Sequence, residues 1–270
     1  MRSAGLARLE SLLQARKLDS TLTNAVRRTE MTPARPTGMP SLDEALGGGW
    51  RQGEISEIVS GRSTGRTSVL IATLAEATRQ GGIVGLVDAF DRFDPLIASR
   101  AGLDPGRMLW IRGPSLTLEG LHTSSRREHA REGAGRRPAG ARGLGAGDAV
   151  MEAVHRAICA LDLLLRAGGF AVAAVDLGDV PARAIRALPL TTWMRLAHAN
   201  EGRETVGLLL GDVAMGRSAR GASVRLQATA QWSGTSAQSR RFAGFHVQAE
   251  IAQARQMLQR APCWHTRATG

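Results

Sequence analysis

The sequence predicts an α/β fold with a mostly parallel sheet flanked by helices. From residue 41 onward, strand-like and helix-like segments alternate, as they do in parallel sheets with crossover helices. The runs 83–87 and 171–175 are almost wholly apolar, which fits central strands covered on both faces. A third observation is a strand–loop–helix unit, in which an apolar run at 55–59 leads through a Gly/Ser/Thr loop into a helical pattern.

Periodicity and turn residues assign the elements in chain order. A short helix at 41–46 is ended by three glycines at 47–49. The expected core strands are 54–59, 83–88, 108–112, 170–176 and 206–210, and the expected helices are 68–79, 94–101, 149–167 and 181–199. Two further strands, 222–231 and 245–252, follow without a helix between them. We therefore expect them to be antiparallel additions at the sheet edge.

Flanking segments complete the predicted domain organisation, in which residues 41–262 form the core. Leucines at helical spacing within 4–19 predict an amphipathic helix, so residues 1–29 are expected to form an N-terminal helical arm. Residues 30–40 are rich in Pro and are expected to be a linker. Residues 263–270 are expected to be a tail, and the run Cys263, Trp264 and His265 reads as a packed or frayed end in preference to a metal site.

A basic insertion at 122–148 interrupts the alternation. It holds arginines among Gly, Ala and Ser and has no aromatic residue, which predicts a disordered loop. A flexible arm that touches the DNA backbone and a tolerated surface insertion both fit this composition. The arginines are Arg126, Arg127, Arg131, Arg136, Arg137 and Arg142.

Composition limits the function classes. The net charge of +11 favours a polyanionic partner, nucleic acid first, although an arginine-rich composition with one lysine, Lys17, also follows from a GC-rich genome. Aromatic residues make up only 4% of the chain and Tyr is absent, which argues against a base-stacking platform. No apolar run is long enough for a transmembrane helix or typical of a signal peptide. The two cysteines, Cys159 and Cys263, fit a reducing cytoplasm and no zinc site.

The loop at 60–68 is a candidate phosphate-binding loop, since backbone N–H groups at a helix N-terminus attract phosphate. It follows the pattern G-x-x-x-x-G-K-[ST] incompletely, because Ser60 replaces the first Gly and Arg66 replaces the Lys, while Gly65 and Thr67 fit. Either a nucleoside triphosphatase or the remnant of one is consistent with this loop. The candidate nucleotide-binding residues are Ser60, Gly61, Ser63, Thr64, Gly65, Arg66, Thr67 and Ser68.

Several segments in order resemble the bacterial recombinase RecA from about residue 36 to 262. They are Thr37–Gly49, Gly53–Ile58 leading into the loop, Val87–Pro95, Ala101–Asp104, the strand ending in Asp176, and Ala222–Leu226. The resemblance implies a RecA-like P-loop core in which Asp176 is the Walker B acid, so that Thr67 and Asp176 would still allow ATP and Mg²⁺ to bind. It also implies that Arg217 and Arg220 lie in a shortened second DNA-binding loop, where they would contact the DNA backbone; an ordinary charged connection is the alternative.

Departures from the RecA pattern affect ATP turnover. Arg66 is not equivalent to the P-loop Lys, because its guanidinium is longer, planar and differently hydrated. Phe90 stands where RecA has its catalytic Glu, and the neighbouring Asp91 is expected to point elsewhere. Gly211 and Asp212 replace the Asn-Gln pair that senses nucleotide. Anchoring the last RecA strand on 248–250 places Ser239 and Arg241 at two lysines that reach nucleotide across a subunit interface, so one of those charges is lost.

A RecA-like chain of this size with an altered P-loop and an N-terminal helical arm resembles ImuA. This resemblance implies a non-catalytic accessory role in SOS-induced translesion synthesis. The implied partners are an ImuB-like polymerase-family protein, RecA, and single-stranded DNA; RecA-type folds also associate head to tail. Two alternatives stay open: a genuine DNA-dependent ATPase or recombinase, and a RecA-fold clock or cell-division regulator without DNA contact.

Overall fold

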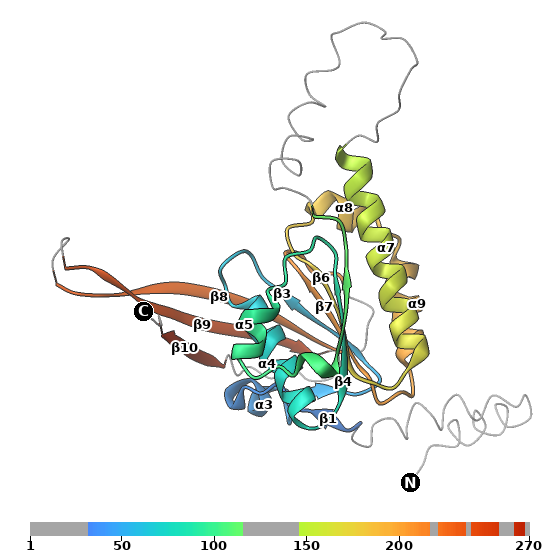
Figure 1. The fold of residues 1–270 in the computed structure, drawn as a ribbon. Coiled ribbons are helices and arrows are strands. Elements are labelled where there is room, and N and C mark those ends of the chain that lie inside the picture. The colour runs from blue at the N-terminus through green and yellow to red at the C-terminus, as the bar shows by residue number, and fades with distance from the viewer. Residues whose placement is uncertain (1–31, 116–145, 217–220, 236–238, 254–261, 268–270) are drawn as a thin grey trace, which may run out of the picture. The chain divides into compact units, whose positions relative to one another are not determined.

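The computed structural model describes residues 32–115, 146–216, 221–235, 239–253 and 262–267, and the fold concerns the unit that begins at Ala34 (Figure 1). The expected arm at 1–29, nearly all of the basic insertion, and Arg217 and Arg220 lie outside these residues. The helices are α3 Pro40–Leu46, α4 Arg66–Arg79, α5 Pro95–Arg100, the 3₁₀ helix η1 Pro105–Arg107, α7 Ala146–Ala167, α8 Ala182–Ala187 and α9 Leu190–Asn200.

The strands form an eight-stranded sheet and a small two-stranded one. The order in the large sheet is β10-β9-β8-β3-β7-β6-β4-β5, and its strands from β8 to β5 are parallel, which confirms the predicted α/β class. The strand bounds are β1 Ala34–Arg35, β2 Trp50–Arg51, β3 Ile55–Val59, β4 Ile83–Asp88, β5 Met108–Arg112, β6 Phe170–Leu177, β7 Val206–Gly211, β8 Ala222–Ser233, β9 Arg241–Gln253 and β10 Cys263–Arg267.

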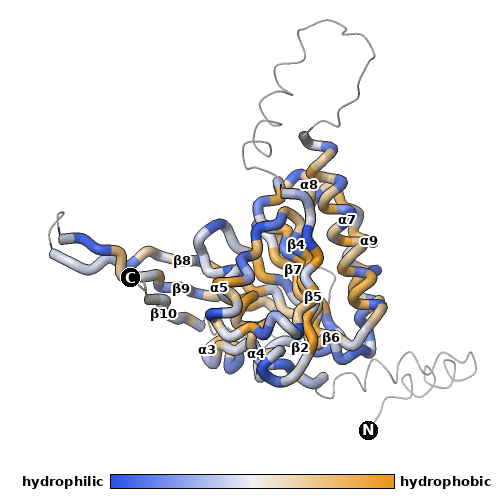
Figure 2. Tube along the Cα trace, viewed as in Figure 1, coloured by the Kyte–Doolittle hydropathy of each residue, from blue (hydrophilic) through white to orange (hydrophobic). Residues whose placement is uncertain are grey.

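Two apolar layers cover the sheet. One contains α3, α4 and α5 and packs on β3, β4, β6, β7, β8 and β9. The other contains α7, α8 and α9 and packs on β3, β4, β6 and β7, but no residue of β8 or β9 belongs to it. Figure 2 shows the hydrophobic residues along central strands such as β4 and β7. The face of β8 and β9 on the α7–α9 side therefore has no helical cover among the described residues.

The structure differs from the sequence-based assignment at both C-terminal strands. We expected both to be antiparallel edge additions, but β8 pairs in parallel with β3 on one side and antiparallel with β9 on the other, so it lies inside the sheet. β9 in turn pairs antiparallel with β10. Residues 263–267, expected within a tail, form β10 against β9. Residues 248–250 lie within β9, and β10 follows them, so the placing of the RecA lysine positions at Ser239 and Arg241 stays a prediction.

Two other segments also depart from expectation. The expected linker includes β1, which pairs with β2, and Thr37 is fully buried with its backbone N–H donating to Asp43. The predicted helix 181–199 is divided into α8 and α9, because Pro189 favours an extended backbone at the preceding Leu188. This break positions α8 and the start of α9 beside the carboxyl ends of the central strands (Figure 1).

Candidate functional site: a closed phosphate-binding loop

The loop between β3 and α4 has the backbone expected of a phosphate-binding loop. Gly65 precedes α4 with φ of 96°, a conformation that glycine adopts without strain, and Ser63 has φ of 56°. The Thr64 hydroxyl donates to the Gly61 carbonyl at 2.7 Å, which braces the turn. Thr67 and Ser68 are exposed in the first turn of α4, where helix N–H groups have no intrahelical partner.

The Arg66 side chain turns back onto this loop and binds acceptors of the protein itself, and we call the loop closed in this sense. The side chain is buried, and its Nη1 donates to the Ser60 carbonyl at 2.5 Å and to Asp212 Oδ1 at 2.6 Å. Gly178 leaves room for the guanidinium, since a Cβ there would lie only 2.1 Å from Arg66 Nη2. The cation at the position of the phosphate-binding lysine is thus held by protein acceptors. In the sequence, Asp212 stood out only as a replacement in the nucleotide-sensing pair, and its contact with Arg66 was missed.

Asp176 lies at the carboxyl end of β6 beside this arginine. Its Oδ1 accepts the Gly178 N–H at 2.8 Å. Burial raises the pKa of Asp176, and the positive charge of Arg66 opposes that rise. Asp176 is the carboxylate that could face a Mg²⁺ ion together with the exposed Thr67. No group of three His, Cys, Asp or Glu side chains suited to a metal occurs among the described residues.

Further arginines around the loop are also paired with acids. Asp179, with φ of 65°, bonds Arg62 at 2.5 Å and also pairs with Arg92. Burial and then repulsion by Arg62 lower the pKa of Arg92, whose guanidinium lies 5.6 Å from the centre of the Phe90 ring. Positive charges that could bind a triphosphate are therefore already balanced inside the protein.

Phe90 is only 2% exposed and packs in the core on the α7–α9 side of the sheet. Its ring can neither orient nor deprotonate a water molecule. Asp91 has φ of 57° and makes two hydrogen bonds of 2.7 Å with Arg112, which lowers the pKa of Asp91. The prediction that Asp91 points elsewhere is confirmed, because Arg112 on the edge strand β5 holds its carboxylate.

Glu57 is a site residue that sequence reasoning missed. This 4% exposed side chain on β3 accepts the N–H groups of Met215 and Gly216, each at 2.7 Å, and the Ser223 hydroxyl at 2.7 Å. It fixes the segment that follows β7 and leads toward Arg217 and Arg220. A carboxylate inside a short strand that is otherwise apolar except for Ser56 was the sequence signal that could have revealed it.

Known proteins provide an independent comparison. A family model described as the RecA N-terminal domain matches residues 18–121. RecA of Treponema pallidum (strain Nichols) is 44% identical over 87 residues, which are 32% of this chain and 21% of that protein. RecA of Bacteroides thetaiotaomicron is 41% identical over 86 residues, covering 32% and 26%, and RecA of Prochlorococcus marinus (strain MIT 9303) is 39% identical over 74 residues, covering 27% and 20%.

Over these residues the chain is RecA-like. The aligned segment spans about a fifth to a quarter of the length of these relatives. The region matched by the family model includes β3, the loop, α4 and β4, so the altered positions Ser60, Arg66 and Phe90 all fall within it. None of the helices in the described part of the chain combines the length and the hydropathy that crossing a membrane requires.

Proposed function

We propose that this protein is a RecA-like DNA-repair accessory factor that acts by binding and not by ATP turnover. The observation that carries the proposal is the engagement of Arg66 with Ser60 and Asp212. Phosphoryl transfer depends on cations that face the phosphates and on a group that orients the nucleophile. Arg66 is occupied by protein acceptors, and the position of the catalytic carboxylate holds a buried ring, Phe90.

The proposed setting is SOS-induced translesion synthesis. An ImuB-like polymerase-family protein and RecA are the proposed protein partners, and single-stranded DNA is the proposed nucleic-acid partner. The similarity to RecA and the net charge of +11 support a role in DNA metabolism. The resemblance to ImuA supports the assignment to translesion synthesis.

A nucleotide titration tests the absence of turnover. Purified protein is titrated with a fluorescent ATP analogue and Mg²⁺, with and without single-stranded DNA, and phosphate release from ATP is followed in parallel. We expect no phosphate release above that of a heat-inactivated sample. Asp212→Asn is the matched variant, because it removes the negative charge that pairs with Arg66 without changing the shape of the side chain, and we expect it to bind the analogue more tightly than the wild type. Phosphate release stimulated by DNA would overturn the proposal.

The second candidate is a DNA-dependent ATPase. Thr67, which lies in the RecA-like region, and Asp176, at the end of β6, favour it because both would hold Mg²⁺ and nucleotide. This candidate requires Arg66 to leave Asp212 when ATP binds. It predicts that Thr67→Ala and Asp176→Ala abolish phosphate release stimulated by DNA, whereas the accessory factor has no such release to lose.

The proposed role in the cell is tested separately by damage-induced mutagenesis. A strain that lacks the gene is complemented with the wild type, Arg66→Ala or Thr67→Ala, and mutation frequency after irradiation is measured. We expect wild-type frequency from both variants, since neither side chain needs to contact nucleotide in an accessory factor. A null phenotype for stably expressed Thr67→Ala would contradict this expectation.

A further inference from the structure

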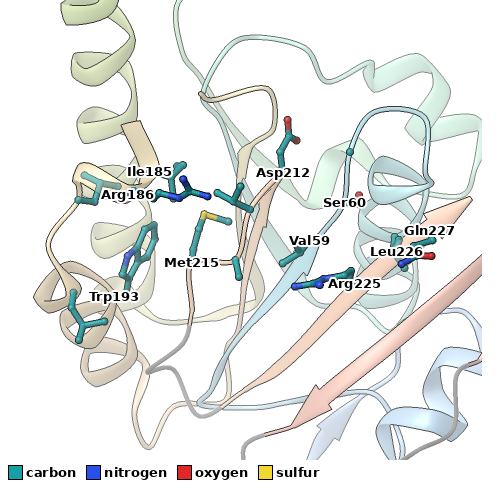
Figure 3. Close-up of a pocket in the computed structure, with 15 residues that line it drawn as sticks. Val59, Ser60, Ile185, Arg186, Trp193, Asp212, Met215, Arg225, Leu226 and Gln227 are labelled. Atoms are coloured by element: carbon teal, nitrogen blue, oxygen red, sulfur yellow. The ribbon is translucent and has the colours of Figure 1, made fainter. Parts of the chain in front are cut away.

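A cavity of about 840 Å³ opens between the carboxyl ends of β3 and β7, the start of β8, and the α8–α9 corner (Figure 3). It lies where the α7–α9 layer stops and the uncovered face of β8 begins. Arg186, Met215 and Trp193 lie on one side of it, and Val59, Arg225 and Gln227 lie on the other. Ligand pockets commonly lie at the carboxyl ends of parallel strands, as this cavity does.

The cavity has an apolar floor. Ile185, Leu188, Trp193 and Met215 line it and are each less than 8% exposed, so their packing sets its shape without help from a ligand. Leu190, in contrast, is 55% exposed at the cavity. An exposed leucine beside a preformed apolar floor is a contact point for an apolar group from another molecule.

Two exposed arginines also line the cavity. Among the described residues neither Arg186 nor Arg225 forms an ion pair, although Glu250 is the register partner of Arg225 on β9. This sets them apart from Arg62, Arg66 and Arg92, whose charges are balanced by acids. Ser60, whose buried hydroxyl has no hydrogen-bond partner among the described residues, lines the same cavity.

We propose that this cavity binds a protein segment in which an acidic side chain lies next to a bulky apolar one. The apolar side chain packs on Leu190 and the floor, and the carboxylate pairs with Arg186 or Arg225. Single-stranded DNA fits less well, since it carries a charge at every nucleotide and needs a longer cationic track. The cavity offers only Arg186 and Arg225, neither with an ion pair in the described part of the chain, beside the carboxylate of Asp212, and the Trp193 ring is too buried to serve as an open stacking face.

The proposed partner is thus an acidic, apolar peptide segment, and this inference does not depend on whether ATP is hydrolysed. The test uses fluorescence anisotropy with a short labelled peptide that alternates glutamate and leucine. Two matched peptides replace glutamate with lysine or leucine with serine, and labelled oligothymidine represents nucleic acid. We expect saturable binding of the glutamate–leucine peptide only.

Protein variants locate the site. We expect the double variant Arg186→Glu and Arg225→Glu to weaken binding of the glutamate–leucine peptide about tenfold, because both positions that could pair with the peptide carboxylate then repel it. Leu190→Ser should weaken it several-fold. The controls are Arg195→Glu and Met194→Ser, which change exposed residues of α9 that do not line the cavity and should leave affinity unchanged.

Three outcomes would overturn the proposal. The first is no saturable binding of the glutamate–leucine peptide. The second is equal loss of affinity in the cavity variants and the control variants. The third is binding of oligothymidine that the double variant abolishes, which would make the cavity a nucleic-acid site. All variants are first compared with the wild type by circular dichroism and thermal midpoint, so that a folding defect is not read as loss of binding.

Discussion

The contact between Arg66 and Asp212 can be measured as a coupling energy. The perturbation is a double-mutant cycle with Arg66→Met, which keeps an unbranched side chain without the charge, and Asp212→Asn. The two charged atoms are 2.6 Å apart. At an effective dielectric constant of about 20 that separation corresponds to a gross attraction of about 6 kcal/mol.

Solvent reduces this value considerably. The Arg66 side chain is 10% exposed and that of Asp212 is 32% exposed, so the pair lies between the surface and buried classes of ion pair. Exposed pairs contribute roughly 0.2–1 kcal/mol, whereas breaking buried ones costs roughly 3–5 kcal/mol. We therefore expect a coupling energy of about 1–2 kcal/mol, with each single variant less stable than the wild type.

The assay is urea unfolding of the wild type, the two single variants and the double variant, followed by tryptophan fluorescence at neutral pH. The coupling energy is the stability change of the double variant minus the sum of the single changes. Repeating the cycle at high salt should reduce it, because Asp212 is partly exposed. A coupling energy below about 0.3 kcal/mol at low salt would refute the closed loop and with it the main support for the proposed function.

Four other predictions concern stability. Glu57→Ala should destabilise the protein by about 3 kcal/mol in urea unfolding, and Glu57→Gln by clearly less, because an amide can still accept from the 215–216 backbone and donate to Ser223; equal losses would contradict this. Asp176→Asn should raise the thermal midpoint more at pH 8 than at pH 4. The pKa of Asp176 is raised in the folded protein, so ionising this carboxyl costs stability once the pH rises above the ordinary pKa of 3.8; a difference that is the same at both pH values would argue against a desolvated Asp176. Phe90→Ala should cost about 3–4 kcal/mol in urea unfolding, and a loss below about 1 kcal/mol would show that the ring is not packed. Replacing residues 122–145 with a short Gly-Ser linker should leave the thermal midpoint nearly unchanged, because the sequence there has few apolar residues to bury; a large drop would contradict this.

The central part of the fold could be predicted because its signals are local. Apolar runs such as 83–87 and 171–175, and the glycines that end helices, depend only on neighbouring residues, and the structure places elements there. The parallel pairing of β8 with β3 could not be predicted in this way, since it joins residues 57 and 223. Which strands become neighbours depends on the whole chain. The sequence pattern of a strand next to a hairpin is the same whether that strand lies at the edge of a sheet or inside it.

The candidate site shows the same division. The altered loop and Phe90 were visible in the sequence, because each stands at a fixed position in a motif. The partner of Arg66 was not visible, since Asp212 follows it by 146 positions.

Composition was also a poor guide to aromatic clustering. Although aromatic residues are few, the rings of Trp232, Phe242 and Phe245 stack edge to face near the end of the β8–β9 hairpin, with Arg240 beside Trp232.

The position of β3 has a consequence for synthesis of this protein on the ribosome. Ile55 on β3 pairs with Gly207 on β7, and Glu57 pairs with Ser223 on β8, so both neighbours of this strand are made long after it. At about 5–20 residues per second the apolar strand waits roughly 7 to 30 seconds for its first neighbour. A nascent chain that stops before residue 206 leaves both edges of β3 unpaired, which makes such a product a target for chaperones and proteases.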